Sequence, residues 1–103
     1  MNLDPSYVYV MTNKPRGTLY IGVTADLVRR ASEHKQLIGR TFTARYNLDK
    51  LVWFEKFEQI ELAIQRETNL KRWYRQWKIQ LIEQTNPQWR DLFEDICPTS
   101  VEA

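Results

Sequence analysis

The 103-residue chain has little cysteine and no long apolar run, and each shortage excludes a class of protein. Its single cysteine, Cys97, can complete neither an internal disulfide nor a zinc site made of several cysteines, which indicates a cytoplasmic protein. No apolar run approaches the roughly 18 residues that a membrane-spanning helix needs, so no membrane partner is expected. Residues 1–5 lack both a basic start and an apolar stretch, so a signal peptide is not expected either.

Internal repeats, low-complexity tracts and dividing linkers are also absent, which favours one domain with one core. Hydrophobic residues make up 43% of the chain and charged residues 27%, as is typical of a folded globular protein. The carboxylates form no dense cluster, which argues against a nuclease site with two metal ions. Any metal-assisted mechanism in this chain should therefore use one ion.

The net charge of +2 is weak evidence for an anionic partner, but the charges are unevenly distributed. Residues 66–78 contain five basic residues and one acidic residue, whereas residues 83–103 are mainly acidic. One face of the protein can therefore be basic while the whole is nearly neutral. Such a face fits either an anionic partner or an ordinary solvated helix surface.

Periodicity and composition predict an α+β fold. Runs of β-branched and aromatic residues predict strands at residues 7–12, 18–24 and 51–57. Helical patterns predict a helix at residues 26–36, helical structure from residue 59 to 85, and a short helix at residues 88–96. Residues 37–49 have the composition of a loop, and a break near residues 73–77 is left open. The predicted architecture is a small three-stranded antiparallel β-sheet flanked by helices.

The first two strands should form a hairpin with two distinct faces. Val8 and Val10 point to the core face, which leaves Tyr9 and Tyr20 on the other face. A four-residue loop at residues 13–16 would place the two tyrosines directly across from one another. Gly22 would then leave open space beside Tyr20 for another backbone or a ligand. The pair is either an ordinary cross-strand contact or part of a site.

The next helix carries two candidate functional residues, Arg30 and His34, which are four apart and share one face. A guanidinium suits bidentate phosphate binding, and an imidazole can transfer protons or donate to a phosphate oxygen. His34 is the only histidine. On spacing alone, the two residues fit a surface pair as well as a site.

Glu67 lies among basic residues on the later helix and has two interpretations. Its spacing from Lys71 is that of a surface salt bridge, worth only tenths of a kcal/mol. Alternatively, its carboxylate is a ligand for Mg²⁺, an ion that often takes one or two carboxylates and completes its shell with waters and phosphate oxygens.

Taken in order, these segments resemble the GIY-YIG nucleases. Residues 7–9 (Tyr-Val-Tyr) and 20–22 (Tyr-Ile-Gly) are similar to the paired motifs that name the family, although the first keeps only its final tyrosine. Residues 24–34 resemble the family's helix motif, and residues 63–71 resemble its glutamate segment. Residues 86–89 (Asn-Pro-Gln-Trp) resemble the ending of the small single-domain bacterial subfamily.

The resemblance implies a nuclease domain at residues 7–92, between an N-terminal tail at 1–6 and a C-terminal tail at 93–103. It implies that Tyr9 is the general base or the activator of the attacking water, and that Tyr20 positions water and phosphate. Arg30 matches the arginine that contacts the scissile phosphate, and His34 matches the nearby histidine.

Three further positions follow from the same resemblance. Glu67 matches the glutamate that binds one divalent metal ion, Mg²⁺ or Mn²⁺. Gly22 and Asn86 match supporting positions. The implied activity is metal-dependent hydrolysis of phosphodiester bonds by a structure-selective or weakly specific endonuclease. DNA is favoured over RNA as the partner, and the expected state is a monomer or weak homodimer. Repair, recombination and defence against foreign DNA are all compatible roles.

Surface residues on the later helix lead to the remaining expectations. Lys71, Arg75 and Lys78 recur at one helix stripe, which either follows a phosphate backbone or is a solvated face opposite the apolar stripe through Leu70 and Leu81. The alternative to the nuclease is a nucleic-acid-binding module without catalysis. A further option is a subunit that needs a partner or dimer, for which exposed aromatic residues at 73, 74 and 77 would be suited.

Overall fold

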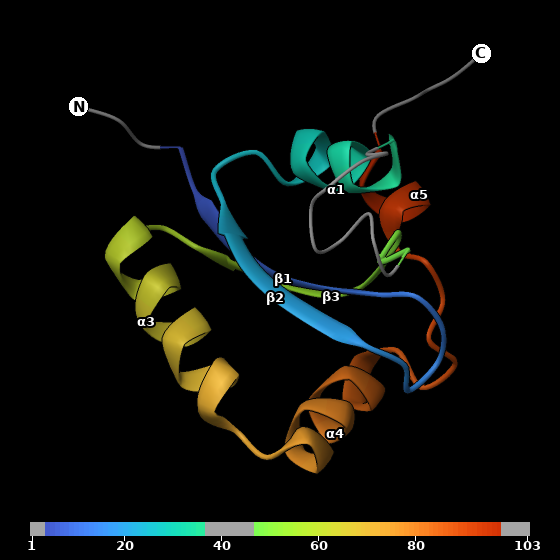
Figure 1. Cartoon of the computed structure of the whole chain (residues 1–103). Coiled ribbons are helices and arrows are strands. Elements are labelled where there is room, and N and C mark those ends of the chain that lie inside the picture. Colours follow the sequence, from blue (N-terminus) through green and yellow to red (C-terminus); the bar gives the residue numbers. More distant parts are fainter. Residues whose placement is uncertain (1–3, 37–46, 98–103) are drawn as a thin grey trace.

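The computed structural model of the chain describes residues 4–36 and 47–97. Three strands form one antiparallel sheet: β1 at Ser6–Thr12, β2 at Leu19–Thr24 and β3 at Lys50–Phe57. Their order is β2-β1-β3, with β1 in the centre, as Figure 1 shows. The predicted α+β class, a three-stranded antiparallel sheet flanked by helices, is confirmed. Of the loop expected at residues 37–49, residues 37–46 lie outside the described residues.

Helices cover both faces of the sheet. They are α1 at Leu27–Gln36, α3 at Ile60–Arg72, α4 at Arg75–Thr85 and α5 at Phe93–Ile96. Helices α1 and α5 lie on one face, and α3 and α4 lie on the other (Figure 1). No described helix combines the length and the apolar composition that crossing a bilayer demands.

The sheet is buried on both faces. The core therefore consists of two apolar clusters, where the sequence predicted one core. The α3 face carries Val8, Val10, Ile21, Val52, Trp53, Ala63, Leu70, Ile82 and Trp89. The α1 face carries Tyr9, Met11, Leu27, Ala31, Leu48 and Leu51. The predicted separation of Val8 and Val10 from Tyr9 is confirmed, because alternate strand residues point to opposite faces.

The hairpin register differs from the expected one. Thr12 pairs with Leu19, so six residues form the connection and Tyr9 lies opposite Gly22 instead of Tyr20. Side chains hold this longer turn: Thr18 N donates to Asn13 Oδ1 at 3.0 Å, and Thr12 Oγ1 donates to Thr18 O at 2.7 Å. The prediction that Tyr9 and Tyr20 lie directly across from one another is therefore wrong, and they are diagonal neighbours.

Helix α1 begins as the sequence predicts. The Asp26 carboxylate accepts a hydrogen bond from the backbone N–H of Arg29 at 3.1 Å, the bond expected of an N-cap residue. Leu27, Ala31 and His34 follow at positions i, i+4 and i+7, and all three are buried. This stripe turns one side of α1 toward the sheet and brings His34 with it.

The break that the sequence left open near residues 73–77 is present, and the later helical segment forms two helices. Trp73 and Tyr74 both adopt extended backbone conformations, with ψ of 151° and 147°, and they separate α3 from α4. The apolar stripe expected along one helix is therefore interrupted, and Trp77 remains 49% exposed. The expected stripe of Lys71, Arg75 and Lys78 is wrong for the same reason, since Lys71 belongs to α3 and the other two to α4.

The C-terminal segment also differs in detail. Only Phe93–Ile96 of the helix expected at residues 88–96 is helical, and Trp89 has a left-handed backbone with φ of 58°. Phe93 and Ile96 pack against the cluster on the α1 face, and Ser6 pairs with Phe57 in the sheet. Regular elements thus begin one residue before and end four residues after the span 7–92 expected from the sequence.

Candidate active site

The centre of the candidate site is the side chain of Tyr9 on β1, which is 1% exposed. Its hydroxyl lies 3.1 Å from Nε2 of His34 on α1. Its ring centroid lies 6.2 Å from that of Tyr20 on β2. Residues from the two strands of the hairpin and from the next helix therefore meet at one place on the α1 face of the sheet.

Gly22 makes room for Tyr9 and not for Tyr20, which corrects the expectation of open space beside Tyr20. A Cβ atom added to Gly22 would lie 2.6 Å from the Tyr9 hydroxyl oxygen and 2.7 Å from Cζ. Such contacts are too short for any side chain, so the ring of Tyr9 occupies the space above Gly22. The glycine is required by the close approach of a neighbouring ring.

His34 packs against both tyrosine rings. Its ring centroid is 5.6 Å from that of Tyr9 and 5.3 Å from that of Tyr20. The residue is 3% exposed, and its Nδ1 has no hydrogen-bond partner in the described part of the chain. Burial, followed by the charge of Arg30, lowers the pKa of His34 to about 4. The imidazole is therefore neutral at pH 7.

Arg30 provides the positive charge of the cluster. Its side chain is 40% exposed, and its guanidinium donates to the Glu33 carboxylate at 3.0 Å. A hydrogen bond with Tyr9, followed by the bond with Glu33, raises the pKa of Arg30 above its ordinary value, so the group stays charged. Arg30 thus joins the buried tyrosine to the surface. Glu33, which sequence reasoning missed, could have been found from its i+3 spacing to Arg30.

The pKa of Tyr9 is raised to about 12, mainly because burial disfavours the phenolate. The hydrogen bond and the charge of Arg30 act in the opposite direction, but they do not outweigh burial. The phenol is therefore protonated at neutral pH in the chain without substrate. This state differs from the lowered pKa that a general base would need.

Glu67 is not brought among these four residues. It lies on α3, which covers the opposite face of the sheet, and it shares a helix side with buried Ala63 and Leu70. Its side chain is 20% exposed and forms an ion pair with Lys71 at 2.8 Å. Among residues 4–36 and 47–97, no group of three or more His, Cys, Asp or Glu side chains is arranged to hold a metal ion.

The remaining predicted positions have structural contacts. Arg75 donates to the backbone carbonyls of Arg16 and Gly17, the latter at 2.6 Å, and so ties α4 to the hairpin turn. Lys78 Nζ donates to the carbonyl of Lys71 at 3.5 Å. These bonds connect the start of α4 to the hairpin turn and to the end of α3.

Asn86, which is 3% exposed, is held away from the candidate site by backbone contacts. Its amide nitrogen donates to the carbonyls of Val52 and Arg90, and its amide oxygen accepts from the N–H of Arg90. All three bonds are 2.8–3.1 Å long. The side chain therefore fixes the turn after α4 against β3.

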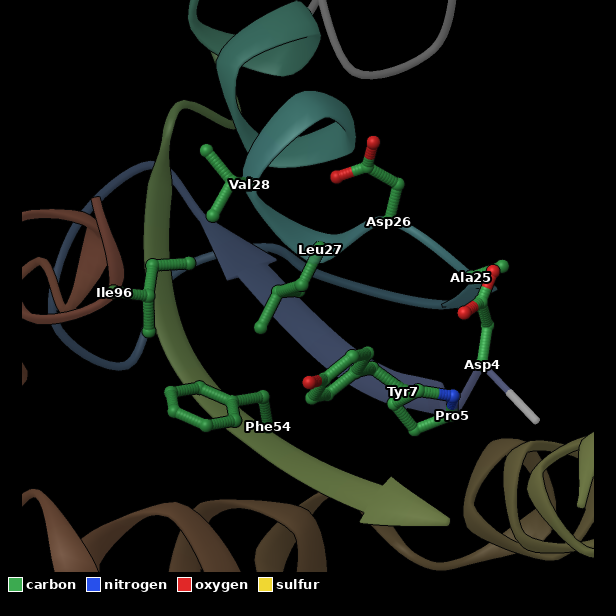
Figure 2. A pocket seen from close by; sticks show the side chains of 9 residues that line it. All are labelled: Asp4, Pro5, Tyr7, Ala25, Asp26, Leu27, Val28, Phe54 and Ile96. Carbon is green, nitrogen blue, oxygen red and sulfur yellow. The ribbon is translucent and has the colours of Figure 1, made fainter. Parts of the chain in front are cut away.

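A separate hollow of about 350 Å³ lies beside the start of α1 (Figure 2). The side chains of Tyr7, Leu27 and Phe54 converge on it, and the carboxylates of Asp4 and Asp26 stand at its edge. Its lining includes none of the four clustered residues, so it is distinct from the candidate site.

A three-stranded antiparallel sheet with paired tyrosines on the hairpin, and with Arg and His on the following helix, defines the GIY-YIG nuclease fold. The model of the GIY-YIG catalytic domain matches residues 5–80, and this chain belongs to that family.

Relatives in several organisms agree with this membership. A UPF0213 protein of Haloquadratum walsbyi is 36% identical over 81 residues, which are 79% of this chain and 90% of that protein. A UPF0213 protein of Clostridium perfringens is 38% identical over 77 residues, covering 75% and 82% of the two chains. The solution NMR structure of a UPF0213 protein from Bacillus halodurans has a TM-score of 0.53 and 25% identity, covering 93% of this chain and 99% of its own.

Proposed function

We propose that this chain is a metal-dependent endonuclease of the cytoplasm that hydrolyses phosphodiester bonds in DNA, with structure-selective or weakly specific cutting. The observation that supports this most directly is the meeting of Tyr9, Tyr20, Arg30 and His34 at one place, in a chain of the GIY-YIG catalytic-domain family. These side chains offer a cation for a phosphate and two tyrosine hydroxyl groups.

Arg30 is the group best suited to receive the scissile phosphate. It keeps its charge, and 40% of its side chain is exposed, so an anion can reach it. Its present partner is Glu33, and exchange of that carboxylate for a phosphate oxygen conserves the charge-assisted hydrogen bond. Bound there, the guanidinium offsets the charge that develops on the phosphoryl group.

In this proposal Tyr9 accepts a proton from the attacking water, directly or through another water molecule. With a pKa of about 12, Tyr9 cannot do so in the free chain at neutral pH. The role therefore requires that the pKa of Tyr9 fall in the complex with substrate, which takes a net gain of positive charge near the hydroxyl because the phosphate itself brings negative charge. Neutral His34, 3.1 Å away, holds the hydroxyl in place, and Tyr20 on the neighbouring strand positions water and phosphate.

In this proposal the carboxylate of Glu67 is the one protein ligand to a Mg²⁺ or Mn²⁺ ion, since no group of three or more His, Cys, Asp or Glu side chains in the described residues could hold it. Its partly buried carboxylate already accepts a cation, the ammonium of Lys71, at 2.8 Å. A single carboxylate with water and phosphate oxygens is a common ligand set for Mg²⁺. An ion held by Glu67 would supply Lewis-acid polarisation of the phosphate. Lys71 would then have to move away from the oxygen that it contacts.

A second candidate function is a nucleic-acid-binding module that lacks catalysis or needs a partner. Two observations favour it. The pKa of Tyr9 is raised, and Glu67 forms an ion pair with Lys71 on the helix that covers the opposite face of the sheet from Tyr9. Such a module would bind nucleic acid but would not cut it as an isolated chain.

The test is cleavage of labelled single-stranded, duplex, flap and branched DNA with Mg²⁺, with Mn²⁺ and with a chelator. We expect metal-dependent cutting that both Tyr9→Phe and Glu67→Ala reduce by at least about a hundredfold, the usual range for losing a general base or an electrostatic group. Lys14→Ala, a change at an exposed turn residue, is the matched control and should cut normally. Cutting by either active-site variant at the wild-type rate would remove that residue from the mechanism, and absence of cutting by all proteins would favour the binding module.

A further inference from the structure

The corner between α3 and α4 exposes aromatic side chains that the proposed reaction does not use. Tyr74 is 71% exposed and Trp77 is 49% exposed, although large aromatic residues usually bury most of their surface. Tyr74 lies in the extended break between the two helices, and Trp77 lies in the first turn of α4. Figure 1 shows this corner at the connection between the two helices.

The three rings are held as one array. The ring centroids of Tyr74 and Trp77 are 4.9 Å apart at an interplanar angle of 76°, and those of Trp73 and Trp77 are 6.1 Å apart at 82°. The carbonyl of Tyr74 also accepts backbone hydrogen bonds from Trp77 and Lys78, at 3.0 and 3.3 Å. Edge-to-face packing and these bonds give the rings a defined geometry before any partner binds.

A hollow of about 420 Å³ adjoins this array, within the size range of small-ligand pockets. Its lining combines aromatic surface with amide groups and consists of Trp73, Trp77, Gln80, Leu81 and Gln84. Gln80 and Gln84 are one helical turn apart on α4, so they present their amides on the same side. Aromatic faces beside amide donors and acceptors are suited to a flat ring with polar edges.

The charge around the corner identifies the kind of partner. Residues 71–80 contain four basic residues, Lys71, Arg72, Arg75 and Lys78, and no acidic residue. A second copy of the chain would bring the same positive surface against itself in a symmetric contact, which like charges oppose. A polyanion with exposed flat rings satisfies both the charge and the aromatic surface.

We propose that this corner binds an unpaired base of a nucleic-acid strand, with the base stacked on Trp77 in the hollow and the neighbouring phosphates on Lys71 and Lys78. The inference rests on the proposed function in one respect, since it names the feature of the substrate that the nuclease would hold. A single strand or a branched junction offers such a base, whereas the bases of a blunt duplex are stacked on one another.

The test is equilibrium binding in the presence of chelator, measured by fluorescence anisotropy with a labelled thymidine 20-mer, a uridine 20-mer and a blunt DNA duplex. We expect Trp77→Ala to weaken binding of a single strand by about tenfold, as stacking one base usually contributes, and to leave duplex binding within about twofold. Gln80→Ala should weaken it less. The two single strands separate DNA from RNA as the source of the base.

Ile64→Ala is the matched control, because Ile64 is also a helix residue that is 49% exposed. It should bind all three ligands as the wild type does. Tyr74→Ala provides a second variant at the most exposed ring, and circular dichroism checks that each variant is folded. Equal weakening of single-strand and duplex binding, unchanged binding by all corner variants, or a dimer that Trp77→Ala dissociates would each overturn the proposal.

The outcomes separate this inference from the proposed catalysis. If Trp77→Ala weakens binding but the wild-type chain cuts no DNA, base binding at the corner is supported and the nuclease proposal is refuted. If cutting depends on Glu67 but Trp77→Ala binds DNA as the wild type does, the nuclease proposal is supported and base binding at the corner is refuted.

Discussion

The burial of His34 leads to a specific prediction about stability and pH. The pKa of His34 is about 4 in the folded chain, against an ordinary value of 6.5. Below pH 6.5 the unfolded chain binds a proton that the folded chain does not bind until about pH 4. The contribution of neutral His34 to folding is therefore complete above pH 6.5 and is lost as the pH falls toward 4.

The magnitude follows from the same two values. A difference of one pKa unit corresponds to 1.36 kcal/mol, so the full effect is about 3 kcal/mol. Between pH 7.5 and pH 5 the free energy of unfolding should fall by about 2 kcal/mol on this account. This interval lies above the usual titration range of carboxylates, and His34 is the only histidine, so no other histidine contributes to the change.

Urea unfolding at several pH values between 5 and 7.5 measures this slope, and the variant His34→Gln should lose it. The groups that face His34 in the described structure are Tyr9, Tyr20, Arg30 and Glu33. The single set of histidine ring signals in NMR spectra reports the folded-state pKa directly. A folded-state pKa of His34 at or above 6.5, or a wild-type slope retained by His34→Gln, would contradict this prediction.

Three further predictions concern side chains that hold the site and the fold. Gly22→Ala places a Cβ atom 2.6 Å from the Tyr9 hydroxyl, so it should destabilise the chain by roughly 1–3 kcal/mol in chemical unfolding, and Tyr9→Ala in the same chain should remove most of that penalty. Asn86→Ala leaves three backbone groups without their partner, of which the Val52 carbonyl is buried, and should cost about 1–3 kcal/mol, with cutting per folded molecule unchanged. A selective loss of cutting would instead place Asn86 in the chemistry. Arg75→Ala releases the hairpin turn and should lower the melting temperature more than Lys71→Ala does, whereas equal melting temperatures would show that its bonds to Arg16 and Gly17 contribute nothing.

Local patterns were enough to predict most of the elements. Alternation along residues 7–12 separates Tyr9 from Val8 and Val10, because a strand has a period of two whatever it packs against. The start of α1 follows from the Asp26 side chain, which bonds to the helix that it precedes. These features depend on neighbours within a few residues, so the sequence contains them.

Features that depend on longer-range contacts could not be predicted in the same way. The register of the hairpin depends on how the side chains of Asn13 and Thr12 hold the connection. Because the connection is two residues longer than expected, Gly22 instead of Tyr20 lies opposite Tyr9. The break between α3 and α4 contains neither Gly nor Pro, and Trp73 lies at a point where the chain turns to pack against the α3-face cluster. Sequence spacing alone therefore left this break open and placed Lys71, Arg75 and Lys78 on one basic stripe.

The placement of Glu67 shows what the proposed reaction requires of this fold. Tyr9 and His34 lie on the α1 face, and Glu67 lies on the helix that covers the other face. Strand β2 is an edge of the sheet, so no further strand lies beyond it to separate the two faces there. Tyr20 and Gly22 belong to this edge strand. In the proposed reaction, a phosphodiester that contacts Arg30 and also reaches Glu67 would have to cross an edge of the sheet, and β2 is the edge strand that carries Tyr20 and Gly22.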